Sequence, residues 1–249
     1  MSFTALVLAG SRGGDDPLAA HEGVSDKALI NFAGKTMLHR VVNALREAGA
    51  ARIAISVSSE AVADHARTLG VEVLNAAPGP SESVARALDA LGTPLLVTTA
   101  DHALLRPEWV TRFLADVPAD ADVAALLAER EEIERAVPET KRTYLRFADG
   151  AWSGCNLFWL ANPSAAGAIA LWRRVEADRK RPWRIVRRLG PGLLFRYLLG
   201  RLTLTDALAR LGTSAGVRAT AVASPFGLAA VDVDKPGDVV LVRRLLQPS

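Results

Sequence analysis

Cysteine is nearly absent from this sequence, and long hydrophobic runs are absent altogether. The single cysteine among 249 residues, Cys155, excludes an internal disulfide framework and fits a reducing compartment. No apolar run reaches the ~18 residues of a membrane span, and no basic residues precede the short apolar run of MSFTALVLAG. Half of the residues are hydrophobic and 23% are charged, which suits a sizeable buried core. We therefore expect a soluble, cytoplasmic globular protein.

Two common nucleotide-binding motifs are missing as well. G-x-G-x-x-G does not follow the first apolar run, which excludes the dinucleotide fingerprint. GKT at Gly34 to Thr36 resembles the end of a Walker A loop, but that motif needs a glycine where this chain has Leu29. A nucleotide site here has to be built in another way.

What the sequence does contain is a regular alternation of strand and helix patterns. Strands are predicted at 4–9, 51–57, 71–74 and 94–99, and helices at 36–48, 59–69, 81–91 and 107–115. The second half is predicted as a strand and turn at 150–160, a helix at 165–179, a helical region at 182–211 with a break at 190–192, strands at 218–223 and 229–233, and a closing helix at 236–246. This order predicts one α/β domain over 1–249, a doubly wound, mostly parallel, Rossmann-like sheet with helices on both faces.

The loop after the first strand is long and unusual. It holds two glycines, adjacent Asp residues, Arg12 and Lys27. Ligands of such sheets bind beyond the carboxyl ends of the strands, so this loop, 75–83 and 100–105 should share one rim. Backbone N–H groups and the two cations suit a triphosphate. For Gly13-Gly14 alone, a plain surface loop is the other interpretation.

Four motifs together resemble the nucleotidyltransferases of GT-A-like fold, among them the MobA-like proteins. They are LAGSRGG at 8–14, DKALINFAGKTML at 26–38, TTADHALL at 98–105 and VDVDKPGDV at 231–239. The resemblance implies a Mg²⁺-dependent enzyme that transfers a nucleoside monophosphate from a nucleoside triphosphate to a phosphorylated small molecule or lipid, releasing pyrophosphate. Ser11 replaces the second glycine of the family's first motif.

The resemblance also implies roles for individual residues. Lys27 would contact the α-phosphate and the acceptor, and Arg12 the β- and γ-phosphates. Asp101 and Asp234 would bind Mg²⁺, with Asp232 as the alternative second ligand. The remaining nucleotide contacts would come from Leu8, Ala9, Gly10, Ser11, Gly13, Gly14, Pro80, Ser81 and Ser83, and the acceptor contacts from Gly154 and Asn156.

Other interpretations remain open at this stage. Asp101 is also typical of a helix N-cap or turn, and Asp238 of a charge at a helix N-terminus. His102 has a small claim to the site because it adjoins Asp101. A GT-A glycosyltransferase that uses a nucleotide sugar is the second function, although TTADHALL lacks the D-x-D of that class. A non-catalytic nucleotide- or membrane-binding relative is the third.

Charge is unevenly distributed along the chain. Residues 116–139 hold eight acids and two Arg, whereas 173–188 hold eight bases and two acids. We interpret 164–213 as a basic amphipathic helical insertion. Its segment 173–202 fits a peripheral membrane contact, a homodimer contact or packing on the domain. No nucleic-acid-binding module accompanies the charge, so we expect no nucleic-acid partner.

Overall fold

The computed structural model describes residues 2–10, 16–140, 142–178 and 191–247. The chain divides into two compact units. The first unit comprises Met1–Arg112 and Val231–Ser249, and the second comprises Phe113–Ala230. The C-terminal segment therefore returns to the unit in which the chain starts.

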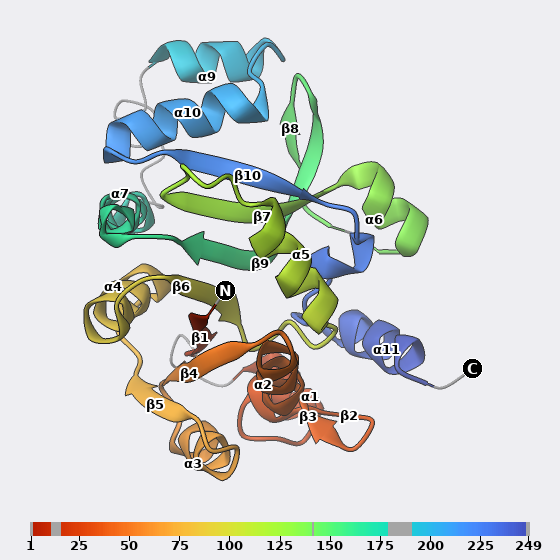
Figure 1. Ribbon diagram of the computed structural model, residues 1–249. Coiled ribbons are helices and arrows are strands. Elements are labelled where there is room, and N and C mark those ends of the chain that lie inside the picture. The colour runs from red at the N-terminus through yellow and green to blue at the C-terminus, as the bar shows by residue number, and fades with distance from the viewer. Residues whose placement is uncertain (1, 11–15, 141, 179–190, 248–249) are drawn as a thin grey trace. The chain divides into compact units, whose positions relative to one another are not determined.

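The first unit is built on four parallel strands. They lie in the order β6-β1-β4-β5, with helices α2, α3 and α4 between successive strands of the chain (Figure 1). The elements are β1 (Phe3–Ala9), α1 (Pro17–His21), the 3-10 helix η1 (Lys27–Leu29), β2 (Asn31–Phe32), β3 (Lys35–Thr36), α2 (Met37–Glu47), β4 (Ala50–Val57), α3 (Glu60–Thr68), β5 (Glu72–Asn75), α4 (Pro80–Leu91), β6 (Leu95–Thr99) and α11 (Pro236–Leu245). Helix α5 (Pro107–Asp116) contains the boundary between the units.

The central strand β1 explains why this sheet forms. Ala5, Leu6 and Val7 are fully buried, because β1 has a parallel neighbour on each side and helices cover its faces. Helix α2 buries Val41 and Leu45, one turn apart on a single face. The core thus fixes where β1 and β6 end, and both strands end toward the loops predicted to bind nucleotide.

The second unit has a mixed sheet. Strand β10 pairs parallel to β7, β7 pairs antiparallel to β9, and β9 pairs antiparallel to β8. The elements are β7 (Val123–Glu129), α6 (Arg130–Ala136), β8 (Leu145–Phe147), β9 (Gly150–Leu160), η2 (Pro163–Ala165), α7 (Ala166–Ala177), α9 (Pro191–Leu198), α10 (Leu204–Ala215), β10 (Ala219–Ser224) and η3 (Gly227–Ala230). The predicted class, a mostly parallel α/β sheet with helices, is confirmed.

One predicted strand is wrong, and the longest of the strands that were not predicted is β7. Residues 229–233 form no strand: Gly227–Ala230 is a 3-10 helix, and the backbone N–H of Val233 donates to the carbonyl of Asp101 at 3.0 Å. The apolar alternation there reflects burial of Val231 and Val233 in a loop rather than pairing in a sheet. Strand β7 was missed because alanine and leucine fill most of its buried and half-buried positions alike. The sequence there shows only a weak alternation of apolar and polar residues.

Candidate active site

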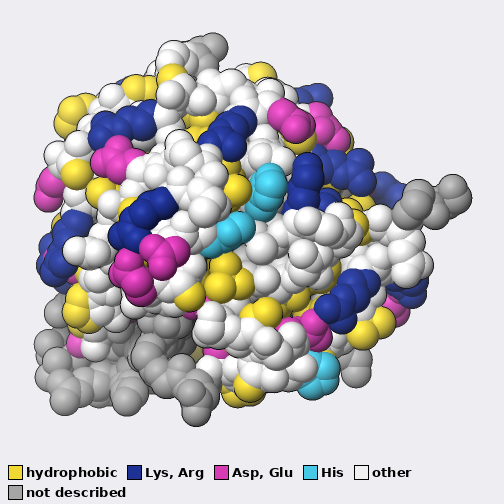
Figure 2. Space-filling view, turned by 90° about the horizontal axis from the view of Figure 1, so that it is seen from below, with side chains coloured by type: hydrophobic (Ala, Val, Ile, Leu, Met, Phe, Trp, Pro, Cys, Tyr) yellow, Lys and Arg dark blue, Asp and Glu magenta, His cyan; other side chains and the backbone are white. Residues whose placement is uncertain are grey.

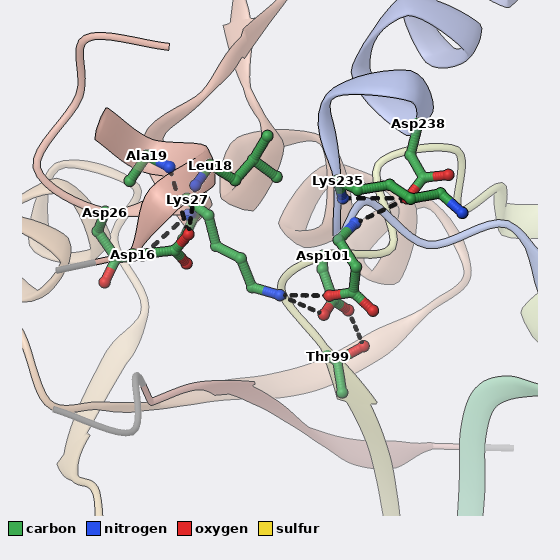
Figure 3. Close-up of polar contacts among 11 residues, drawn as sticks. Asp16, Leu18, Ala19, Asp26, Lys27, Thr99, Asp101, Lys235 and Asp238 are labelled. Carbon is green, nitrogen blue, oxygen red and sulfur yellow. Dashed lines mark hydrogen bonds and ion pairs between the residues drawn. The ribbon is translucent and has the colours of Figure 1, made fainter. Parts of the chain in front are cut away.

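Lys27 lies at the start of η1, and local capping sets its position. The carboxylate of Asp26, only 6% exposed, accepts the N–H of Ala28 at 2.9 Å. Asp16 caps α1 in the same way, accepting the N–H of Leu18 at 2.8 Å. Asp16 and Asp26 therefore act as helix N-caps, a common role of Asp. The Lys27 side chain extends from the start of η1 toward Asp101 (Figure 3).

The ammonium of Lys27 meets two carboxylates from distant parts of the chain. Its Nζ lies 2.9 Å from Oδ2 of Asp101 and 2.8 Å from Oδ1 of Asp234. These residues are separated from Lys27 by 74 and 207 positions. Figure 3 shows the Lys27 side chain reaching across to Asp101. The predicted cation and the two predicted metal ligands thus converge within one unit.

Asp101 is oriented by the strand that precedes it. Thr99, the last residue of β6, donates its hydroxyl to Oδ1 of Asp101 at 2.5 Å, so one carboxylate oxygen is held by Thr99 and the other by Lys27. Of the two alternatives for Asp101, the helix N-cap is wrong, because the next helix begins only at Pro107, whereas the turn is confirmed. Thr99 was not predicted as a site residue, although its place two residues before Asp101 in TTAD was a usable signal.

Asp234 is held by the start of helix α11. The carboxylate of Asp238, 6% exposed, accepts the N–H groups of Asp234 and Lys235, both at 3.1 Å. This is the helix N-terminal role expected for Asp238. The contact fixes the backbone of Asp234, whose own side chain is 62% exposed and meets Lys27. Asp238 therefore positions Asp234 through the backbone.

The electrostatics of Lys27 follow from this arrangement. Partial burial by itself lowers the pKa of Lys27, but the charge of Asp101 and the hydrogen bonds to Asp234 and Asp101 outweigh it, so the pKa is raised. Lys27 is therefore a permanent cation at neutral pH. The site combines a fixed positive charge with two carboxylates, which suits phosphate chemistry better than proton abstraction by a neutral amine.

The nucleotide-binding candidates that the structure describes lie at two places in the same unit. Leu8 and Ala9 end β1 and Gly10 follows it, whereas Pro80 to Ser83 begin α4. A Cβ placed on Gly10 would lie 3.3 Å from the Cβ of Ala76, in the loop before α4, so these two segments approach closely. Ser83 Oγ accepts the N–H of Ala77 at 2.9 Å and shapes that loop.

Comparison with known proteins identifies the family. The family model described as "MobA-like NTP transferase domain" matches residues 5–219. The chain belongs to the MobA-like NTP transferase family. The predicted family and the predicted transferase class are thereby confirmed.

Individual relatives agree with this assignment. A transferase structure from Thermus thermophilus is 33% identical, with a TM-score of 0.81, covering 96% of this chain and 100% of that one. The bifunctional protein GlmU of Azorhizobium caulinodans is 37% identical over 123 residues, 44% of this chain but 28% of that protein. The chain thus matches little more than a quarter of that curated relative. Rv0371C of Mycobacterium tuberculosis, solved in complex with manganese, shares the fold at 19% identity and a TM-score of 0.53, with 97% of each chain covered.

Four of the predicted residues of this MobA-like domain cannot be placed. Ser11, Arg12, Gly13 and Gly14 lie outside the described residues, and so do residues 179–190 of the predicted insertion. Their predicted roles stay predictions.

The two predicted acceptor residues belong to the second unit. Gly154 is exposed on β9, and Asn156 has a φ of +51°. The register with β7 shifts here: Leu127 pairs with Gly154, whereas Ala125 pairs with Phe158, so β9 carries extra residues between them. A bulge with left-handed backbone at Asn redirects side chains and is common beside functional sites. The acceptor role of Gly154 and Asn156 stays a prediction.

His102 and Cys155 are both buried side chains. His102 is only 1% exposed, and its ring lies 6.0 Å from that of Trp109. Cys155 is buried on β9, and burial raises the pKa of its thiol to about 12, so it is not a nucleophile at neutral pH. Both side chains are therefore accounted for by burial.

Proposed function

We propose that this protein transfers a nucleoside monophosphate from a nucleoside triphosphate to a phosphorylated small molecule or lipid, using Mg²⁺ and releasing pyrophosphate. The observation that carries the proposal is the convergence of Asp101 and Asp234 on the ammonium of Lys27. A cation beside paired carboxylates, at the carboxyl end of a parallel strand, is the arrangement that phosphoryl transfer needs. Membership of the MobA-like NTP transferase family supports the same reaction.

The residues present fit a Mg²⁺ ion. Asp101 and Asp234 supply hard oxygen donors, and the Lys27 ammonium shows that their geometry already accommodates a cation. No third His, Cys, Asp or Glu joins such a group among the described residues. Mg²⁺ commonly takes one or two carboxylates and completes its shell with water and phosphate oxygens, so two suffice. When bound, Mg²⁺ would neutralise negative charge on the phosphoryl oxygens of the nucleotide.

Lys27 has a distinct task. An acceptor phosphate and a nucleoside triphosphate are both anions and repel each other as they approach. The Lys27 ammonium offers donors to both, because it is charged at every pH at which the enzyme works. To contact both phosphates, the Lys27 ammonium has to break its ion pair with at least one carboxylate. The pair with Asp234 breaks more easily, because the Asp234 side chain is 62% exposed.

The reaction needs no general base. An oxygen of the acceptor phosphate attacks the α-phosphorus, the bond from that phosphorus to the bridging oxygen breaks, and pyrophosphate leaves with the electron pair. A phosphate monoester is mostly ionised at neutral pH, since its second pKa is about 6. Arg12, if it reaches the β- and γ-phosphates as predicted, would stabilise the leaving group.

Pyrophosphate release tests this function. We expect release from at least one of ATP, GTP, CTP and UTP when Mg²⁺ and a phosphorylated acceptor are both present, and none after EDTA is added. Sugar 1-phosphates, polyol phosphates and phosphorylated lipids should be offered separately. Hydrolysis of a nucleotide sugar, with no pyrophosphate from any triphosphate, would favour a glycosyltransferase. A protein that binds nucleotide without either reaction would be the non-catalytic relative.

Asp238 provides a second test, which separates positioning from general stability. We expect Asp238→Ala to destabilise the fold by about 1 kcal/mol, the usual cost of a lost helix cap. It should also lower turnover about tenfold, because Asp234 is no longer held in place. Asp238→Asn retains an oxygen acceptor and should recover most of both. Urea unfolding measures the stability and pyrophosphate release measures the turnover. If the loss of turnover in the two variants were no larger than their loss of stability accounts for, the positioning role would be contradicted.

A further inference from the structure

Glu22 lies at the end of helix α1, and we call residues 22–32 the Lys27 segment. Gly23, with a φ of +70°, donates its N–H to the carbonyl of Ala20 at 3.2 Å and closes the helix, which fixes the backbone around Glu22. The side chain of Glu22 is only 9% exposed and forms an ion pair with Arg243 of α11. Helix α11 therefore holds the Lys27 segment at its first residue.

Arg243 also contacts the other end of the Lys27 segment. Its guanidinium carbon lies 5.9 Å from the centroid of the Phe32 ring, within the range of a cation–π contact. Phe32 belongs to β2 and is fully buried, so its ring has a fixed position. One side chain of α11 thus contacts the chain on both sides of Lys27, at Glu22 and at Phe32.

The ion pair of Arg243 with Glu22 differs from an ordinary surface pair. Figure 2 shows a face on which Lys and Arg side chains lie beside Asp and Glu side chains, and exposed pairs of that kind contribute little. In the pair of Arg67 with Glu60, for example, the side chains are 54% and 77% exposed. In the pair of Arg243 with Glu22 they are 48% and 9% exposed. Removing Arg243 leaves a mostly buried carboxylate without this partner, which costs more than losing an exposed pair.

Helix α11 carries the second carboxylate of the site as well. Asp238 in its first turn holds the backbone of Asp234, and Arg243 lies in its last turn. The Lys27 segment and the helix that positions Asp234 are therefore joined twice. One link is the ion pair of Lys27 with Asp234, at 2.8 Å, and the other is Arg243.

We propose that Arg243 is a positioning residue, which keeps the Lys27 segment docked on α11 when the Lys27 ammonium leaves Asp234 to meet phosphate. The contacts of Arg243 with Glu22 and Phe32 do not involve the Lys27 side chain, so they persist through that separation. Alignment of the site is then kept while one of its ion pairs is broken. The movement of Lys27 rests on the proposed function, whereas the docking of the segment does not.

Hydrogen exchange of the nucleotide-free protein tests the docking without any turnover. The reporters are three N–H groups that are hydrogen-bonded within the Lys27 segment, those of Ala28, Leu29 and Ile30. We expect Arg243→Met and Lys27→Met each to raise these exchange rates by no more than about threefold, because one link remains, and the double variant to raise them at least about thirtyfold. Val239 and Val242 stay buried on α11, so the helix should remain in place.

The matched control is Arg52→Met, alone and combined with Lys27→Met. Arg52 is 47% exposed, close to the value for Arg243, and pairs with Glu72 at 2.6 Å between β4 and β5. Neither control should exchange faster than its parent. The proposal is overturned if the double variant with Arg243→Met is no faster than the product of the two single effects, or if Arg52→Met accelerates exchange equally. Equal acceleration in β1 would show general unfolding and would overturn it too.

Pyrophosphate release tests the consequence for catalysis. Arg243→Met should lower kcat about tenfold, because a less firmly docked Lys27 is poorly aligned with the phosphates. Arg243→Lys retains the cation and should recover most of the rate, which a loss of packing alone would not explain. An active wild type with an unaffected Arg243→Met variant overturns the catalytic role of the docking. A wild type that releases no pyrophosphate contradicts the proposed function instead, and the exchange rates still decide whether Arg243 docks the segment.

Discussion

Lys27→Met lowers the rate of nucleotidyl transfer by at least about 10²-fold, the scale on which one electrostatic stabiliser of a phosphoryl or acyl transfer acts. Methionine keeps the length of the side chain but removes the charge that offsets repulsion between triphosphate and acceptor. The measurement is pyrophosphate release at saturating Mg²⁺ and nucleotide. Lys35→Met is the control, because Lys35 is exposed on the β2–β3 hairpin and should leave the rate unchanged.

The same variant has a second effect that does not depend on turnover. Without the Lys27 ammonium, Asp101 and Asp234 no longer share a cation, and a divalent ion meets no competitor. We expect the nucleotide-free Lys27→Met protein to bind Mn²⁺ about fivefold more tightly than the wild type, a modest gain because both ion pairs are partly exposed. Electron paramagnetic resonance of free Mn²⁺ measures it. Unchanged rate and unchanged Mn²⁺ affinity together would remove Lys27 from the site.

Asp101→Asn carries the other large expected effect, a loss of at least about 10²-fold in transfer rate. Asparagine has nearly the same size: its carbonyl oxygen can still accept from Lys27, and its amide N–H can donate to the hydroxyl oxygen of Thr99, so the fold should survive. What disappears is the negative charge of the less exposed carboxylate, at 16% against 62% for Asp234. Mn²⁺ binding should weaken in parallel, opposite in sign to the effect of Lys27→Met.

The control for Asp101→Asn is Asp89→Asn, on the exposed side of α4. It removes the same charge from the same unit without touching the site. If Asp101→Asn retained the rate and the Mn²⁺ affinity of this control, Asp101 would be a structural acid and another ligand pair would have to be sought. The opposite signs of the two Mn²⁺ effects also distinguish loss of a site residue from general unfolding.

Much of the first unit could be predicted from local pattern. The strands predicted at 4–9, 51–57, 71–74 and 94–99 and the helices between them appear within a few residues of their expected places, because buried runs such as 4–9 and glycines such as Gly49 mark where elements start and stop. Helix α1 and strands β2 and β3 were not predicted. The second unit was harder. Strand β7 has a weak apolar alternation, and 229–233, which contains the boundary between the two units, has a strand-like alternation that instead reflects a buried loop. Hydrophobic pattern reports burial, and pairing in a sheet depends on neighbours that the pattern does not contain.

The residues that orient the site were the least visible in the sequence. Thr99 and Asp238 are ordinary for a strand end and a helix start, and only their hydrogen bonds show that one aligns Asp101 and the other the backbone of Asp234. The left-handed conformation of Asn156 was equally hidden, since asparagine adopts it only where the surrounding strand demands it.

The sequence by itself determined the family and named the candidate site residues, because short motifs carry both. Tertiary structure alone decided which atoms meet. Lys27 touches carboxylates 74 and 207 residues away, and the sequence contains no information about the distance in space between residues so far apart. The packing of β1 beside β6, and the return of the C-terminal segment to the first unit, bring the three charges together.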